Sequence, residues 1–131
     1  MTTDLYSASV TARVGSVTSS DNALDLSVHE PTELGGPGEA TNPEQLMAAA
    51  LGSCLIESLR IALGTTGESV DDVTVDSTVT LTDSDGPGYE SRFQLRVSIP
   101  SASNPSDVLA QATSICPFLK SVDGVDVALA G

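Results

Sequence analysis

The fold is decided by residues 41–54, which read Thr41-Asn42-Pro43-Glu44-Gln45-Leu46-Met47-Ala48-Ala49-Ala50-Leu51-Gly52-Ser53-Cys54. Asn42 is a favourable N-cap residue, and Pro43 suits the first position of a helix because its fixed φ is already helical. From Leu46 onward the side chains are apolar or small on every side, which predicts a buried helix rather than a surface helix. We expect this helix to run from Asn42 to Leu63, because Gly64 follows.

The rest of the chain shows strand and turn patterns around this helix. Apolar and polar residues alternate with the period of a half-buried strand, and clusters of Gly, Pro, Asn and Asp separate the segments. The expected elements are strands over Tyr6–Val14, Leu24–Val28, Val73–Leu81, Tyr89–Ile99 and Val122–Leu129, a loop over Glu30–Ala40, a turn over Asp83–Gly88 and a second helix from Asn104 to about Cys116. The chain length predicts a single domain over residues 1–131.

The composition argues against several classes of partner. The chain has 18 acidic and five basic residues and a net charge of -13, whereas nucleic acids and anionic membranes bind clustered Lys and Arg. The first residues lack a basic segment, and no apolar run approaches the roughly 20 residues that span a bilayer, so we expect a cytoplasmic protein. A metal site is not expected, because His29 and two separated cysteines would need carboxylates to complete a zinc shell.

Cys54 and Cys116 are the strongest candidates for chemistry. Cys54 lies well inside the first predicted helix, and Cys116 precedes Pro117, which bends or ends the second. Thiols in the cytoplasm are kept reduced, so a pair there is more often catalytic, redox-sensing or metal-binding than structural. Free cysteines also pack as small hydrophobic residues, and the pattern by itself leaves both interpretations open.

A reactive Cys54 needs a neighbouring positive charge. A thiolate attacks peroxides well and a thiol does so poorly, and both burial and the negative charge of the chain keep Cys54 protonated. The start of the helix is too far along the chain to help. The available bases are Arg13, Arg60, Arg92, Arg96 and Lys120, and spacing alone does not choose among them. Glu44 either gains from the helix dipole as a first-turn acid or holds an arginine in place.

Four segments stand in order along essentially the whole chain, namely Leu34-Gly35-Gly36-Pro37-Gly38, Thr41-Asn42-Pro43-Glu44-Gln45-Leu46, Ser53-Cys54 and Ile115-Cys116-Pro117-Phe118. Together they resemble the Ohr/OsmC family, and the Ohr branch of organic hydroperoxide resistance proteins in particular. The resemblance implies an α+β fold in which antiparallel sheets wrap around two long central helices in an intertwined homodimer. It also implies two active sites at the interface of that dimer.

The resemblance further implies a thiol-dependent peroxidase that binds no cofactor. In the family the first cysteine, here Cys54, attacks the peroxide and becomes a sulfenic acid, and the second, here Cys116, condenses with it to a disulfide. Lipoylated proteins then serve as the external dithiol reductant. An arginine of the N-terminal strand region, which matches Arg13, activates the thiolate, and the glutamate of the Asn-Pro-Glu-Gln segment, Glu44, orients it.

The surroundings of Cys54 predict the substrate class. The residues expected to bind substrate are Leu46, Met47, Leu51, Leu55 and Phe118, whose apolar side chains favour organic hydroperoxides over hydrogen peroxide. Leu55 stands where the family usually has an aromatic residue, Phe118 replaces a tyrosine, and Arg13 lacks the usual Gly-Gly-Arg-Asp turn. Two alternatives remain, namely an OsmC-like relative with a different peroxide preference and a non-enzymatic thiol sensor of oxidants.

Overall fold

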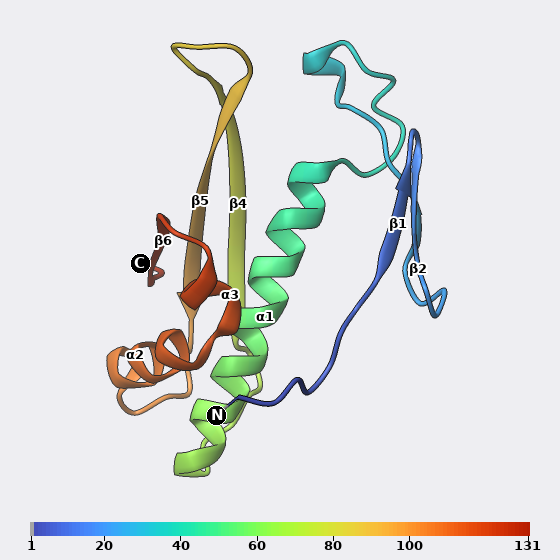
Figure 1. The fold of residues 1–131 in the computed structure, drawn as a ribbon. Helices are drawn as coiled ribbons and strands as arrows, with labels where there is room; N and C mark the ends of the chain where they lie inside the picture. The colour runs from blue at the N-terminus through green and yellow to red at the C-terminus, as the bar shows by residue number, and fades with distance from the viewer. Residues whose placement is uncertain (1) are drawn as a thin grey trace. The chain divides into compact units, whose positions relative to one another are not determined.

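The computed structural model describes residues 2–131, which form two compact units. The first unit extends to Pro43 and contains a small sheet, and the second comprises Glu44–Gly131 with a longer sheet and the α-helices. Figure 1 labels most of their helices and strands. The α+β class expected from the sequence is confirmed.

The first unit is an antiparallel sheet of three short strands, β1 (Val10–Arg13), β2 (Ser16–Ser19) and β3 (Asp25–Ser27). Arg13 pairs with Ser16 across the first hairpin, and Gly15 takes a left-handed φ of 93° in its two-residue turn. The predicted strand over Tyr6–Val14 is confirmed only over Val10–Arg13. The sequence predicted no strand over the residues of β2, because their Ser and Thr side chains suit a strand or a turn.

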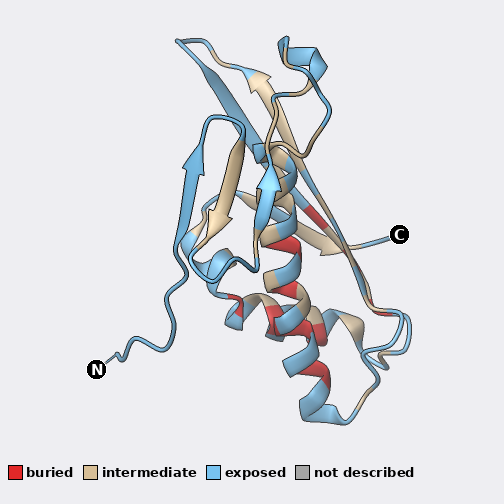
Figure 2. Cartoon of the chain, turned by 90° about the vertical axis from the view of Figure 1, so that its right-hand side faces the viewer, coloured by how far each residue is buried: buried red, intermediate tan, exposed pale blue. Residues whose placement is uncertain are grey.

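This first sheet has no core of its own. None of residues 2–43 is buried, and Figure 2 shows the strands in the colours of exposed and intermediate residues. Leu5, Tyr6 and Val10 are 94%, 82% and 51% exposed. The loop predicted over Glu30–Ala40 is irregular apart from a 3₁₀ turn, η1 (Thr32–Leu34). Large apolar side chains of this unit are therefore open to solvent in the single chain.

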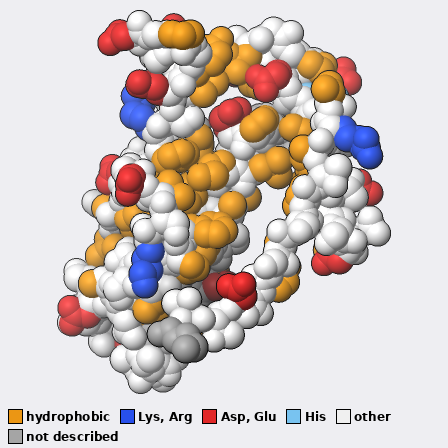
Figure 3. Space-filling view, viewed as in Figure 1, with side chains coloured by type: hydrophobic (Ala, Val, Ile, Leu, Met, Phe, Trp, Pro, Cys, Tyr) orange, Lys and Arg blue, Asp and Glu red, His pale blue; other side chains and the backbone are white. Residues whose placement is uncertain are grey.

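The helix α1 (Pro43–Thr66) begins as predicted and ends slightly later than Leu63. It buries one stripe of side chains, in which Leu51, Leu55 and Leu59 are fully enclosed, whereas Ile61 is 51% exposed. The prediction that α1 is buried on every side is wrong for the single chain, because the second sheet covers only one side of the helix. Figure 3 shows the hydrophobic side chains that remain uncovered over α1.

α1 is also the one helix within residues 2–131 that is long and apolar enough to cross a membrane, with a mean hydropathy of 1.6. The sequence did not predict an apolar run of this length. Exposed Glu57 and Arg60 form an ion pair of 2.8 Å within the helix, and its buried stripe belongs to the main hydrophobic core. The core helix of a folded domain can be as long and as apolar as a membrane-spanning helix. The contacts of α1 are those of such a core helix.

The second sheet is built on a long antiparallel hairpin, β4 (Thr74–Asp83) and β5 (Tyr89–Ser98), which agrees with the prediction. A third strand, β6 (Val125–Leu129), pairs with β5 in parallel, so the sheet is mixed rather than purely antiparallel. Parallel neighbours need a crossover connection, and the helices α2 (Pro105–Ile115) and α3 (Pro117–Ser121) supply it. Leu95 and Val97 of β5 are fully buried in the same core as the leucines of α1.

α1 and β4 approach each other closely at Gly52. A Cβ added to Gly52 would lie 3.3 Å from Cβ of Ser77 and 4.0 Å from Cγ1 of Val75. Glycine costs a helix interior about 1 kcal/mol relative to alanine, so its presence indicates a packing requirement. The hydroxyl of Ser77 is buried at this contact without a hydrogen-bond partner. The contact fixes how deeply α1 sits on the sheet two residues before Cys54.

Cys116 forms the joint between α2 and α3. Its backbone is extended, with φ -70° and ψ 113°, as favoured before a proline. Its N–H donates to the carbonyl of Ala112 (3.0 Å), and its carbonyl accepts from the N–H of Lys120 (3.1 Å). The sequence predicted the break but missed α3, because Pro117 ends one helix and also suits the first position of the next.

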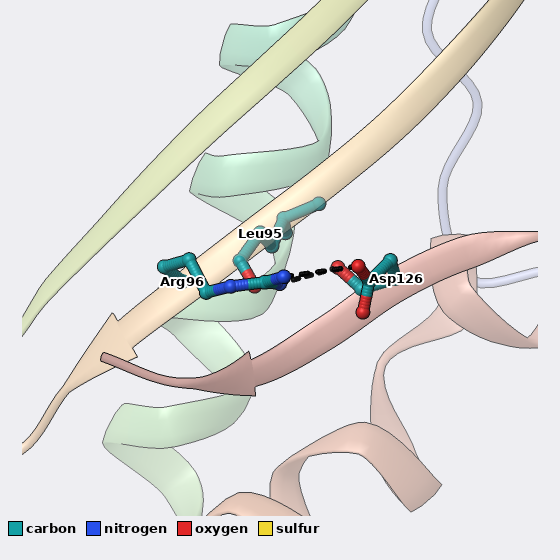
Figure 4. Close-up of polar contacts among 3 residues, drawn as sticks. All are labelled: Leu95, Arg96 and Asp126. Carbon is teal, nitrogen blue, oxygen red and sulfur yellow. Dashed lines mark hydrogen bonds and ion pairs between the residues drawn. The ribbon is translucent and has the colours of Figure 1, made fainter. Parts of the chain in front are cut away.

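β6 is attached to β5 by side chains as well as by the backbone. Nη2 of Arg96 on β5 donates to Oδ2 of Asp126 on β6 (2.9 Å), as Figure 4 shows. Nη1 of Arg96 donates to the carbonyl of Leu95 (3.1 Å) and to the carbonyl of Asp126 (3.3 Å). The strand starts at Val125 rather than Val122, because Gly124 takes a left-handed φ of 77° before it. Arg96, one of the candidate activating bases, is thus engaged in holding β6.

Candidate functional site

The two cysteines lie in contact inside the second unit. Cys54 is in the middle of α1, and Cys116 joins α2 and α3. Their Sγ atoms are 3.5 Å apart, with the Cys116 thiol donating to Cys54, and both are free thiols. A disulfide bond is about 2.05 Å long, so a small movement suffices to bond these residues, which are 62 positions apart in the chain.

The two thiols differ in exposure. Cys116 has no exposed surface and belongs to the buried core with Leu51 and Leu55. Cys54 is half-buried and packs against the edge of that core. A small reactant that enters from solvent therefore meets Cys54 before Cys116.

The surroundings of Cys54 act on its acidity in opposite directions. Burial raises the pKa of the Cys54 thiol above its ordinary value, since an apolar setting disfavours the charged form. The backbone N–H of Phe118 lowers this pKa by hydrogen bonding to the sulfur, and the neighbouring Cys116 thiol raises it. The net shift is upward, so Cys54 needs a further positive charge to react as a thiolate at neutral pH.

The other predicted catalytic residues lie in different units. Arg13 is exposed at the end of β1 in the first unit, and Glu44 is half-buried in the first turn of α1. Arg60 of the second unit pairs with Glu57. The second unit thus brings together the two thiols, and the roles assigned to Arg13 and Glu44 stay predictions.

The five residues predicted to bind substrate occupy three kinds of position. Leu51 and Leu55 are fully buried in the core, Leu46 and Met47 are half-buried, and Phe118 is 44% exposed. One cavity of the second unit lies beside α3 and β6, and another lies beside the C-terminal half of α1. None of the five residues lines either cavity. Their contact with substrate stays a prediction.

Potential metal ligands do not gather in the part of the chain that the structure describes. Within residues 2–131, no three side chains of His, Cys, Asp or Glu are grouped so that they could hold an ion. His29 lies in the first unit, where its Nδ1 is buried without a hydrogen-bond partner. Among the described residues, the reactive side chains that lie in contact are the two thiols.

Comparison with known proteins places this chain in a family. The family model described as OsmC-like protein matches residues 36–130. The chain belongs to the OsmC/Ohr family. An organic hydroperoxide resistance protein of Xanthomonas axonopodis pv. citri (strain 306) is 35% identical, with 95% of this chain and 93% of the relative aligned. Organic hydroperoxide resistance protein OhrA of Bacillus subtilis (strain 168) is 34% identical, with 98% and 97% aligned.

Solved OsmC/Ohr structures share the fold. The crystal structure of an organic hydroperoxide resistance protein from Legionella pneumophila has a TM-score of 0.84 and 31% sequence identity, and the similarity covers 97% of each chain. That of OhrB of Bacillus subtilis has a TM-score of 0.78 and 29% identity, and it covers 96% of this chain and 98% of the other. The similarity thus extends over both units of this chain.

One group acting in this OsmC/Ohr site was missed by the sequence analysis, namely the backbone N–H of Phe118, which acts on the sulfur of Cys54. The available signal was the proline before it. Pro117 opens α3, so the next residue contributes a first-turn N–H that the helix itself does not use. Cys54 thereby gains a hydrogen-bond donor that no side-chain pattern reveals.

Proposed function

We propose that the protein is a peroxidase that reduces organic hydroperoxides to alcohols with Cys54 and Cys116. The observation that carries the proposal is the 3.5 Å contact between a half-buried and a fully buried thiol. Two relatives that align over nearly the whole chain are named organic hydroperoxide resistance proteins. Two unbonded thiols in contact are suited to accept an oxidising equivalent and to hold it as a disulfide.

In the first step, the Cys54 thiolate attacks the terminal oxygen of the hydroperoxide. An S–O bond forms as the O–O bond breaks, and the alkoxide takes up a proton and leaves as the alcohol, so that Cys54 becomes a sulfenic acid. The sulfur of Cys116 then attacks the sulfenic sulfur. The S–S bond forms, and the displaced hydroxyl leaves as water with the proton of Cys116.

In the second step, an external dithiol reduces the disulfide and is itself oxidised to a disulfide. We assign this role to the lipoyl group of a lipoylated protein, and no cofactor needs to be bound because thiols supply both electrons. Arg13 supplies the positive charge that opposes the effect of burial on Cys54, and Glu44 holds its guanidinium by a bidentate pair.

The acting form in this proposal is a cytoplasmic homodimer. The uncovered side of α1 and the exposed apolar residues of the first unit provide surface that a second copy would cover. Leu46, Met47, Leu51, Leu55 and Phe118 give the site an apolar lining. Since each buried CH₂ group contributes about 0.8 kcal/mol, a substrate with several carbons is favoured over hydrogen peroxide.

The test is steady-state reduction of an alkyl hydroperoxide and of hydrogen peroxide with dihydrolipoamide as the electron donor. We expect turnover with a strong preference for the alkyl hydroperoxide, no turnover for Cys54→Ser, and a single oxidation without recycling for Cys116→Ser. Equal efficiency with hydrogen peroxide would favour an OsmC-like relative with a different peroxide preference. A disulfide that forms but is never recycled would favour a sensor, and failure to form one would leave the thiols as packing residues.

A further inference from the structure

We propose that the reducing dithiol attacks Sγ of Cys54 and that Cys116 is the leaving sulfur. The inference rests on the proposed function, because it concerns the Cys54–Cys116 disulfide that the peroxidase cycle creates. It is carried by the difference in burial between two sulfurs that lie in contact.

Access to a disulfide is directional. A thiolate displaces one sulfur from the other by approaching along the S–S axis, from the side opposite the sulfur that leaves, and the reaction rate depends on which sulfur can be reached. To attack Cys116, a reductant would have to come from the side away from Cys54. Cys116 has no exposed surface and lies within the core with Leu51 and Leu55, so that approach runs through packed side chains.

Cys116 is also difficult to expose by a local movement. Its N–H and its carbonyl are hydrogen-bonded to Ala112 of α2 and Lys120 of α3, so turning it outward breaks the joint between the two helices. Cys54 is half-buried on α1, between exposed Ser53 and buried Leu55, so part of its surface is open. The reductant therefore reaches Cys54 without any rearrangement of the core.

The exchange balances in atoms and electrons. The thiolate of the dithiol bonds to Cys54 as the Cys54–Cys116 bond breaks, and the electron pair passes to Cys116, which takes a proton from the second thiol of the reductant. That second sulfur then attacks the reductant sulfur bound to Cys54 and releases the Cys54 thiolate. A charged Cys116 in an apolar core is costly, so rapid protonation by the dithiol assists the step. The reductant leaves as an intramolecular disulfide.

The sulfur that is attacked can be identified by trapping the mixed disulfide. The protein is oxidised, mixed with an excess of an alkyl monothiol probe such as 2-mercaptoethanol, quenched in acid over a series of times, alkylated and digested with trypsin. Cleavage at Arg13 and Arg60 places Cys54 in the peptide 14–60, and cleavage at Arg96 and Lys120 places Cys116 in the peptide 97–120. We expect the probe on 14–60 and the alkyl group on 97–120. The probe on 97–120, or an equal division between the peptides, would overturn the proposal.

Two matched variants test the difference in access directly. The single thiol of Cys116→Ser should react with a disulfide reagent at least about tenfold faster than the single thiol of Cys54→Ser, because only Cys54 reaches solvent. Equal rates would contradict the proposal. Oxidation with diamide as well as with peroxide separates this inference from the proposed function. If only diamide forms the disulfide, the peroxidase proposal fails, and the position of the trapped probe still decides which sulfur is attacked.

Discussion

The two units of this chain are stabilised in different ways. The second unit, Glu44–Gly131, contains every buried residue among residues 2–131, including the leucines of α1 and Cys116. The first unit has a regular sheet but contains no fully buried residue among residues 2–43, and Leu5, Tyr6 and Val10 are exposed. A sheet pattern in sequence therefore does not by itself supply a core. The second unit can hold two thiols in a fixed contact, whereas the first unit presents side chains for another surface.

The largest effect expected from this comparison concerns stability. Leu59→Ala removes a fully buried side chain of the core, so it should lower the free energy of unfolding by about 2–5 kcal/mol. Val10→Ala, on the half-exposed β1, should change it by less than about 0.5 kcal/mol in dilute protein. Urea unfolding of both variants gives the two values. A cost for Val10→Ala close to that of Leu59→Ala would show that the first unit is packed as tightly as the second.

The next effect concerns the role proposed for Arg13 of the first unit. Because burial raises the pKa of Cys54, the rate of peroxide attack should rise with pH until the thiol is ionised. If Arg13 activates the thiol as proposed, Arg13→Ala should raise that pKa further and slow peroxide consumption at neutral pH by roughly tenfold, with recovery in alkaline buffer. Rapid-mixing measurements of the rate against pH provide the check.

Glu44→Ala is the control for Arg13. It should slow the reaction less than Arg13→Ala does, because it loosens the guanidinium without removing its charge. If Arg13→Ala has the pH profile of the unaltered protein, the activating base belongs to the second unit, and Arg60 and Lys120 are the next to replace.

The smallest effect distinguishes two glycines of the same helix. Gly64→Ala should stabilise the protein by about 0.5–1 kcal/mol, since an added Cβ there meets nothing within 4 Å and alanine favours the helix. Gly52→Ala should lose this gain, because its Cβ would press on Ser77 of β4. Thermal unfolding of the two variants compares them. Equal stabilisation by both alanines would show that α1 is not held closely against the sheet.

The sequence predicted the parts of the fold whose signals are local. The hairpin of β4 and β5 follows from strict alternation on either side of a turn, and α1 follows from the Asn42-Pro43 start. β2 and α3 were missed because their residues suit two structures, so that tertiary contacts decide between them. The burial of α1 was overestimated, because an apolar composition shows that a helix can be covered on all sides but not what covers it.

The site was predicted to a similar extent. Cys54 and Cys116 were selected from their local contexts, but a contact between residues 62 positions apart depends on the packing of α2 and α3 across the core. The direction of the Cys54 pKa shift was expected from burial, and the structure agrees. The backbone N–H of Phe118 was not anticipated, because no side-chain pattern encodes it. The choice of Arg13 came from resemblance alone and awaits the measurements above.

The position of Cys116 at the joint between two helices has a consequence for the lifetime of the protein. In the proposed cycle, each oxidation ties the middle of α1 to this joint and closes a loop of about 60 residues. Such a cross-link restricts the unfolded chain and stabilises a fold by about 4 kcal/mol in the chain-entropy description. The oxidised chain would then unfold, and be cleaved by proteases, far less often than the reduced chain. A cell under peroxide stress would thereby preserve this protein longest while it is in use, and would clear it faster once reductant has returned both thiols.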